Sequence, residues 1–152
     1  MSLHESLVEV EDIFELLAVM NVIHNHISAR FSTDVGGELS IAQFGILHFY
    51  FSRPGVRKTL NELADHFSLS KATVVDLVDK LKAKELLVVE ENEKDRRSRL
   101  VSITDKGLAV HGSSLAAVRP FLSEMQDGVG AQTFMEARKL LQPVREWVRE
   151  NK

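Results

Sequence analysis

The chain has 152 residues, of which 44% are hydrophobic and 27% charged, a mixture typical of one globular domain rather than a disordered segment. It contains no cysteine, which excludes disulfides, thiolate metal sites and a thiol-based redox sensor. The formal net charge of -3 argues weakly against nucleic-acid binding, so such a role depends on where the basic residues gather. No signal peptide or membrane-spanning run is recognisable, and the cytoplasm is the expected compartment.

The first predicted element is a helix over residues 7–31 with two apolar stripes at three- and four-residue spacing. One stripe consists of Ile13, Leu16, Met20, Ile23 and Ile27, and the other of Leu7, Val10, Phe14 and Leu17. A helix that faces a single core needs only one stripe. Two stripes favour burial on two sides, against the chain's own domain and against a second subunit. The alternative is a central helix of a monomer.

Glycines and caps mark the next boundary. Gly36-Gly37 is expected to end the first helix, because two glycines in succession favour a turn. Ser40 and Gln43 have the spacing of a capping box, in which each side chain satisfies a backbone donor at a helix start. They predict a second helix over residues 41–51.

Two short helices with a tight turn follow. Thr59 and Glu62 form a second capping-box pattern, which predicts a helix beginning at residue 60. The turn is expected at residues 67–69, and Ser70 is the expected N-cap of a helix over residues 71–84. This order is typical of a helix-turn-helix.

The stretch Asp95-Arg96-Arg97-Ser98-Arg99 carries the most information. It lies between two β-branched runs, residues 86–89 and 100–103, and a charged tip between such runs predicts a β-hairpin. Arginines there project away from any core, where guanidinium groups can reach phosphates or enter a narrow minor groove. Helix, turn, helix and basic hairpin in this order predict a winged helix-turn-helix that binds DNA.

Helical patterns return after the hairpin. Thr104 is the expected N-cap of a long helix that Pro120 would kink, and Gly128 and Gly130 mark a break before a last helix. The last helix carries on one side Phe134, Ala137, Leu141, Val144 and Trp147. The predicted fold is therefore mainly α with a small β-hairpin wing. The winged helix-turn-helix is inserted between N- and C-terminal helices.

These features resemble the MarR (multiple antibiotic resistance regulator) family over nearly the whole chain. The matching motifs are Leu60-Asn61-Glu62-Leu63-Ala64, Ser70-Lys71-Ala72-Thr73-Val74, Leu77-Val78-Asp79-Lys80-Leu81, Asp95-Arg96-Arg97 and Leu100-Val101-Ser102-Ile103-Thr104-Asp105-Lys106-Gly107. Any one of these segments alone would be weak evidence. Their order and spacing together are highly specific.

The resemblance implies a single domain over residues 1–152. Dimerisation helices at 1–33 and 108–152 would flank a DNA-binding lobe at 40–107, whose wing covers 86–104. It also implies an obligate homodimer on a pseudo-palindromic operator in double-stranded DNA. Many members are repressors that a small aromatic or acidic ligand releases, so a repressor with a small-molecule effector is expected. No cofactor, metal ion or membrane is expected as a partner.

The resemblance places the helix from Ser70 in the major groove and the wing in the minor groove. The predicted DNA contacts are Ser68, Ser70, Lys71, Ala72, Thr73, Lys80, Asp95, Arg96, Arg97 and Arg99. Arg97 would enter the minor groove, with Asp95 holding its orientation. Two alternatives stay open. Ser68 and Ser70 could serve only as turn and cap residues, and one of Arg96 and Arg99 could pair with Glu91 or Glu93 instead of phosphate.

Several residues depart from the family pattern. Glu85 stands where a glycine usually closes the recognition helix, Val89 and Glu90 stand where the first wing strand often carries arginines, and Asp76 replaces a commonly basic residue. A more acidic DNA face predicts weaker non-specific binding and a shallower salt dependence. A winged module that binds a protein partner instead of DNA is the competing class.

Histidines raise the question of a metal or ligand site. His24 and His26 are two residues apart on a helix and point in different directions, so they cannot chelate a metal ion together. His48 and His111 could converge from separate helices, although a core or pocket role is favoured over a metal site. The family geometry brings a set of side chains near the junction of the lobe and the dimerisation helices. Either these line a ligand pocket or they fill the core: Met20, His24, Phe44, His48, Phe51 and His111.

Enzymatic activity is not expected. The chain has no cysteine nucleophile, no glycine-rich phosphate loop and no serine in a nucleophile-elbow context. Its carboxylates are scattered along helix faces that are expected to be exposed.

Overall fold

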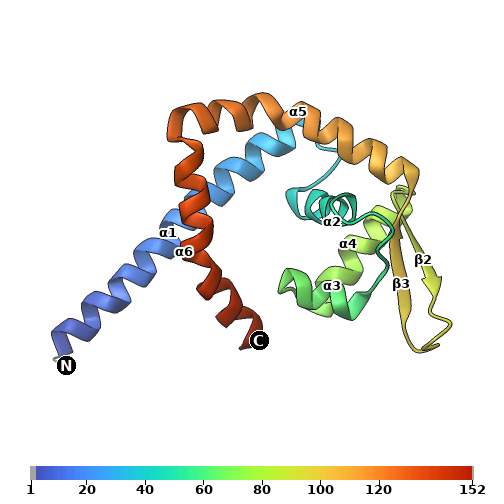
Figure 1. Cartoon of the computed structure of the whole chain (residues 1–152), viewed down its shortest axis with the longest axis horizontal. Helices are drawn as coiled ribbons and strands as arrows, with labels where there is room; N and C mark the ends of the chain where they lie inside the picture. Colours follow the sequence, from blue (N-terminus) through green and yellow to red (C-terminus); the bar gives the residue numbers. More distant parts are fainter. Residues whose placement is uncertain (1–2, 152) are drawn as a thin grey trace. The chain divides into compact units, whose positions relative to one another are not determined.

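The computed structural model describes the backbone of residues 3–151 and the side chains of residues 10–151. The chain divides into two units, Met1–Ile41 and Ala42–Lys152. The first unit consists mainly of α1 (Leu3–Asp34), which extends the predicted helix at both ends (Figure 1). Gly36 and Gly37 follow with positive φ angles of 67° and 73°, so the predicted break is confirmed. The side chain of Leu7, part of one predicted stripe, lies outside the described residues.

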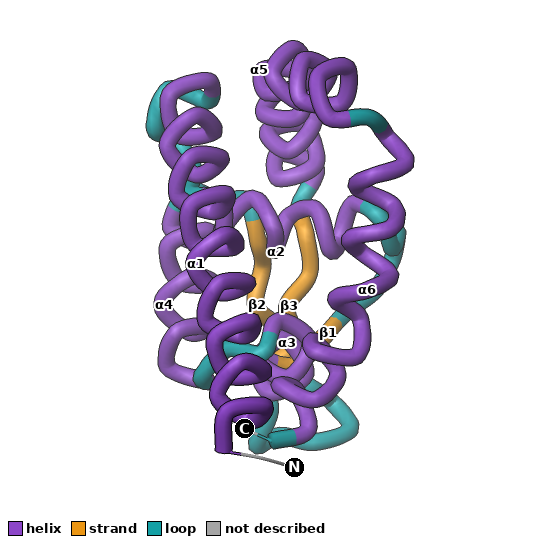
Figure 2. The backbone as a smooth tube through the Cα atoms, turned by 90° about the vertical axis from the view of Figure 1, so that its left-hand side faces the viewer, coloured by secondary structure: helices purple, strands orange, loops and turns teal. Residues whose placement is uncertain are grey.

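The remaining elements follow in the predicted order. They are α2 (Ile41–Phe51), β1 (Lys58–Thr59), α3 (Leu60–Phe67), α4 (Lys71–Ala83), β2 (Leu87–Glu91), β3 (Arg99–Ile103), α5 (Asp105–Val129) and α6 (Ala131–Glu150). The three strands form an antiparallel sheet in the order β1-β3-β2 (Figure 2). A mainly α fold with a small wing is therefore confirmed. None of the described helices is long and apolar enough to span a membrane.

The hairpin has the predicted pairing, and one strand was not predicted. Leu87 pairs with Ile103 and Glu91 with Arg99, which leaves the charged segment as the hairpin tip. The missed strand is β1, in which Lys58 and Thr59 pair with Val101 and Leu100 of β3. A two-residue strand is too short for alternation to appear in the sequence.

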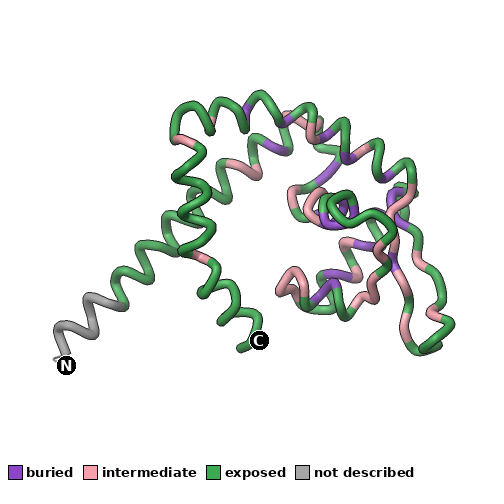
Figure 3. Tube along the Cα trace, viewed as in Figure 1, coloured by how far each residue is buried: buried purple, intermediate pink, exposed green. Residues whose placement is uncertain are grey.

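The core of the second unit lies between α2, α3, α4 and the sheet (Figure 3). Leu63, Val74, Val78, Leu81 and Val101 are at most 1% exposed. Other apolar residues of α3 and α4 are only half-buried: Leu60, Phe67, Val75 and Leu77.

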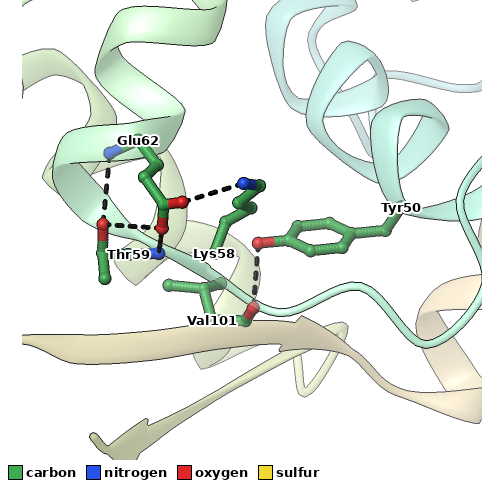
Figure 4. A network of polar contacts seen from close by, with 5 residues as sticks. All are labelled: Tyr50, Lys58, Thr59, Glu62 and Val101. Atoms are coloured by element: carbon green, nitrogen blue, oxygen red, sulfur yellow. Dashed lines mark hydrogen bonds and ion pairs between the residues drawn. The ribbon is translucent and has the colours of Figure 1, made fainter. Parts of the chain in front are cut away.

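A buried hydrogen bond ties α2 to the sheet. The hydroxyl of Tyr50 donates to the carbonyl oxygen of Val101 at 2.9 Å (Figure 4). Burial raises the pKa of Tyr50, so its hydroxyl stays protonated and keeps donating. The fold therefore satisfies a polar group that it has removed from water.

The capping box predicted at the start of α3 is confirmed. The Thr59 hydroxyl accepts from the N–H of Glu62 at 3.2 Å, and the Glu62 carboxylate accepts from the N–H of Thr59 at 2.8 Å (Figure 4). The Lys58 ammonium donates to the same carboxylate at 2.8 Å. The hydrogen bond from Lys58, followed by that from the Thr59 main chain, lowers the pKa of Glu62 to about 2.

The other helix boundaries follow their caps. The Ser70 hydroxyl accepts from the N–H of Thr73 at the start of α4, and the Thr104 hydroxyl accepts from the N–H of Gly107 at the start of α5. The predicted break before the last helix occurs at Gly130, with a φ of 92°, whereas Gly128 lies within α5.

The residue that follows the C-cap of α4 has a left-handed conformation although it is not glycine. Glu85 has a φ of 62°. Its N–H donates to the carbonyl of Lys82 at 2.8 Å, and the N–H of Leu86 donates to the carbonyl of Leu81 at 2.9 Å. These two bonds form a Schellman motif, whose left-handed position is usually glycine because a Cβ atom is strained there.

Replacing Glu85 with glycine is therefore expected to raise the melting temperature by about 3 °C. The gain comes from relief of the left-handed strain, and it exceeds the loss of the exposed Glu85–Lys106 ion pair. Thermal unfolding followed by circular dichroism measures it. Lys106→Ala, which removes the ion pair alone, is the matched control and should leave the melting temperature nearly unchanged. A lower melting temperature for Glu85→Gly would contradict the strain argument.

Candidate nucleic-acid interface

The start of the second helix of the helix-turn-helix and the wing meet at one groove. This groove of about 220 Å³ is lined by Thr59, Leu60, Asn61, Lys71, Arg97, Ser98 and Arg99. Three residues predicted to contact DNA, Lys71, Arg97 and Arg99, therefore lie together although they come from separate parts of the sequence. Sequence reasoning missed Asn61, because a single asparagine near a helix start carries no distinctive pattern.

The opening turn of α4 is exposed, as predicted. Lys71, Ala72 and Thr73 are all accessible to solvent. Ser70 caps the helix, and its hydroxyl lies 2.8 Å from that of Thr73. Ser68 ends α3 in a left-handed conformation with a φ of 54°. Both serines thus have the structural roles that were left open for them, and their contacts with DNA stay a prediction.

Asp95 organises the backbone of the wing tip. Its carboxylate accepts from the main-chain N–H of Arg97 at 3.1 Å, and its carbonyl oxygen accepts from the N–H and the hydroxyl of Ser98 at 2.9 and 3.0 Å. The side-chain amide of Asn92 donates to the Ser98 hydroxyl at 2.9 Å. Asp95 therefore positions Arg97 through the main chain of the turn.

Among the residues whose side chains the structure describes, the wing arginines have no ion-pair partner. Within residues 10–151, the guanidinium groups of Arg96, Arg97 and Arg99 form no ion pair. The pairing with Glu91 or Glu93 left open for Arg96 or Arg99 is thus not found there. All three arginines are exposed. Exposed guanidinium groups without a carboxylate partner remain available for phosphates.

The acidic departures from the family pattern are each paired with a base. Asp76 accepts from the Lys80 ammonium at 2.7 Å, and Glu85 accepts from that of Lys106 at 2.7 Å. Glu90 pairs with Arg57, which precedes β1. These pairs reduce the local negative charge on the DNA face. Lys80, a predicted DNA contact, would have to leave Asp76 to reach a phosphate.

A second cluster joins α2 to α5 and contains four residues of the predicted pocket. His111 is fully buried, and its ring stacks on Phe44 and Phe51 with centroid distances of 4.8 and 4.3 Å. Its Nε2 atom lies 3.1 Å from Nδ1 of His48. The structure therefore brings these four side chains into contact with one another, while His48 and Phe51 remain exposed on one side. Met20 and His24 lie on α1, in the other unit, and their part in a pocket stays a prediction.

The His111 ring makes the stability of the fold depend on pH. Burial, followed by the nearby His48, lowers the pKa of His111 from its usual 6.5. The unfolded chain then binds a proton at a higher pH than the folded chain does. The stability contributed by the neutral ring is fully present above about pH 6.5 and is lost as the pH falls through 6.5 toward the lower pKa of the folded state.

We therefore expect the free energy of unfolding to fall between pH 7.5 and pH 5.5, and to fall more steeply than in His111→Gln. A single proton limits the difference in slope to about 1.4 kcal/mol per pH unit. Urea unfolding at several pH values measures both proteins. Parallel curves for the two would show that His111 titrates alike in the folded and unfolded states.

The described residues contain no group of three or more histidine, cysteine, aspartate or glutamate residues placed to hold a metal ion. The contact between His48 and His111 is consistent with the core or pocket role that the sequence favoured. His24 lies 3.4 Å from the Ser28 hydroxyl on the same helix.

Comparisons with known proteins were made with the sequence and with the fold. Residues 38–98 match the family model of the MarR family. No curated protein sequence matches the chain. The transcriptional regulator BldR from Sulfolobus solfataricus has a similar structure, with a TM-score of 0.74 and 25% identity, over 88% of this chain and 97% of that one.

Two further structures share the fold at lower identity. A mutant MarR from E. coli complexed with operator DNA has a TM-score of 0.75 and 21% identity, over 88% of this chain and 95% of that one. BpsR from Bordetella bronchiseptica, whose DNA binding is regulated by 6-hydroxynicotinic acid, has a TM-score of 0.71 and 22% identity, over 84% and 91% of the two chains.

Proposed function

We propose that this chain is a member of the MarR family and a homodimeric repressor of transcription, because residues 38–98 match the family model and the fold resembles those of solved transcriptional regulators. Proteins of this family are transcription regulators, not enzymes, in agreement with the sequence. The observation that carries the proposal is the groove that unites Lys71 of α4 with Arg97 and Arg99 of the wing. We place the protein in the cytoplasm, with the DNA that it regulates.

The two DNA-reading elements suit different grooves of the double helix. The exposed start of α4, with Lys71, Ala72 and Thr73, fits the major groove, where a helix N-terminus can approach base edges and phosphates. The narrow wing tip suits the minor groove, whose negative potential attracts an arginine such as Arg97. A dimer would present two such sets to the two halves of a pseudo-palindromic operator, with recognition helices about 34 Å apart.

The terminal helices support a homodimer. On α1, nine apolar side chains from Val10 to Ile23 are between 39% and 67% exposed. On α6 no residue is buried, and Trp147 and Leu140 are 65% and 77% exposed (Figure 3). Apolar surfaces of this extent are usually covered in an assembly. We assign residues 1–33 and 108–152 to dimerisation and 40–107, with the wing at 86–104, to DNA binding.

A small aromatic or acidic molecule is the proposed effector. The cluster of Phe44, His48, Phe51 and His111 offers aromatic faces and an exposed imidazole, which suits a ligand with a ring and a carboxylate. The ligand would favour a spacing of the two DNA-binding lobes that no longer matches successive major grooves.

Fluorescence anisotropy with duplexes from the protein's own upstream region tests the proposal. We expect two chains per duplex and a dissociation constant that rises with salt, less steeply than for a relative without acidic residues on its DNA face. The same measurement is repeated with duplexes from the rest of the genome. Equally weak binding to all of these duplexes would contradict the proposal and favour a winged module that binds a protein partner.

A further inference from the structure

The groove between α3, α4 and the wing lies between the two elements that we propose to read DNA. The proposed function, on which this inference rests, places α4 in the major groove and the wing tip in the adjacent minor groove. A phosphodiester backbone always separates two adjacent grooves. We infer that this groove clamps one phosphodiester of that backbone, with Asn61, Lys71 and Arg99 as its ligands.

The lining of the groove matches the chemistry of a phosphate. Lys71 and Arg99 bring positive charge, and the side-chain amide of Asn61 can donate a neutral hydrogen bond. No carboxylate is among the residues that line it. The neighbouring groove on the outer side of the wing differs, since Glu62, Glu90, Glu91 and Glu93 contribute to its lining. Of these two grooves, the one between α3, α4 and the wing is lined by basic residues without a carboxylate, whereas the other mixes Arg57 and Lys94 with four glutamates.

Strand geometry accounts for the position of Arg99 beside this groove, whereas Arg96 lies in the turn of the wing and does not line the groove. Alternate residues of a strand lie on the same face, so Arg99 shares a face of β3 with Val101. Val101 is 0% exposed and lies on the core side. Arg99 extends this core-facing row toward the tip, where α3 and α4 begin. Of the two arginines, Arg99 is therefore the one that we assign to this phosphate.

In the proposed clamp, Asn61 contacts the phosphate and thereby fixes the position of the protein on DNA, without contacting a base. It is the second residue of α3, whose start is held by the Thr59–Glu62 capping box. A rigid helix start holds the amide at a constant distance from the wing. A ligand of the backbone should affect all DNA sequences alike, because phosphates carry no sequence information directly.

The test combines single methylphosphonate linkages in the operator with protein variants. Replacing one charged linkage between the major-groove and minor-groove contacts should weaken binding of the unaltered protein by about tenfold. Asn61→Ala and Arg99→Ala should each weaken binding by a similar factor, on the operator and on mismatched duplexes alike. In the double variant only Lys71 is left to hold the phosphate, so the neutral linkage should weaken its binding less than it weakens binding of the unaltered protein. Arg99→Ala should also lower the slope of log affinity against log salt by about 1 per subunit.

Controls separate the clamp from DNA binding itself. Arg119→Ala removes one exposed charge from α5, outside the groove, and should leave the slope unchanged. Potassium phosphate and potassium chloride of equal ionic strength should displace the duplex equally, whereas stronger displacement by phosphate would indicate a site for a free anion and overturn the clamp. If Asn61→Ala and Arg99→Ala bind like the unaltered protein while Arg97→Ala is impaired, the clamp is wrong and the proposed function stands. If the unaltered protein binds no duplex, both are wrong.

Discussion

Replacing Arg97 with alanine should lower the affinity for a specific operator by at least about 30-fold. Arg97 lies at the exposed tip of the wing without an ion-pair partner among residues 10–151, so its whole charge is available to DNA. One arginine contact contributes about 1 to 3 kcal/mol, and a dimer loses two of them. Fluorescence anisotropy with the operator measures the loss, and circular dichroism confirms that the variant is folded.

Arg96→Ala is the matched control for this prediction. It removes the same charge from the neighbouring residue, which does not line the groove between α4 and the wing. Its effect should be about tenfold or less. If Arg97→Ala and Arg96→Ala were equally mild, the wing would act only through its net charge. If Arg97→Glu retained full regulatory function, the partner would be a protein rather than DNA.

Replacing Gly107 with alanine should destabilise the fold by about 3 kcal/mol. A Cβ atom at this position would overlap the carbonyl oxygen of Leu86 and lie 2.8 Å from Cγ1 of Ile103. The carbonyl of Leu86 cannot move away freely, because it also accepts from the N–H of Thr104 at 3.1 Å. The close approach of α5 to the end of β3 and the start of β2 therefore requires glycine. Urea unfolding followed by circular dichroism measures the loss.

Gly112→Ala provides the contrasting control on the same helix. Nothing lies within 4 Å of the Cβ atom that it would add. Alanine is favoured over glycine inside a helix, so this variant should gain about 0.5 to 1 kcal/mol. Destabilisation by less than about 1 kcal/mol in Gly107→Ala would mean that the junction yields more easily than its geometry indicates.

The helix boundaries were predictable because side chains fix them locally. Thr59, Ser70 and Thr104 each accept a hydrogen bond from a main-chain N–H two or three residues into a helix, and such a pattern is visible in the sequence. The wing was predictable for a similar reason, since two β-branched runs surround a charged tip. The family resemblance added the expectation that the wing and the start of α4 act together on DNA.

Contacts between distant segments were harder to predict. No local pattern joins Arg57 to Glu90, 33 residues away, or Asn61 to the wing. The position of Glu85 at the end of the recognition helix was recognised, but its left-handed conformation was not predicted. Glutamate disfavours that conformation, and the two Schellman hydrogen bonds that hold it there are not visible in the sequence. For His48 and His111 the convergence was foreseen as one possibility. Their hydrogen bond and the stacking on two phenylalanines depend on how α2 and α5 pack.

A hydrogen bond at Glu85 couples the orientation of α5 to the position of α4. The Thr104 hydroxyl donates to the carbonyl of Glu85 at 2.8 Å, so the first turn of α5 is attached directly to the end of α4. α5 has 25 residues and is therefore about 37 Å long. A rotation of α5 by only about 5° about its far end would displace the end attached to α4 by about 3 Å. In the proposed homodimer, opposite movements of the two subunits would double that change, enough to misalign the two recognition helices with a rigid double helix.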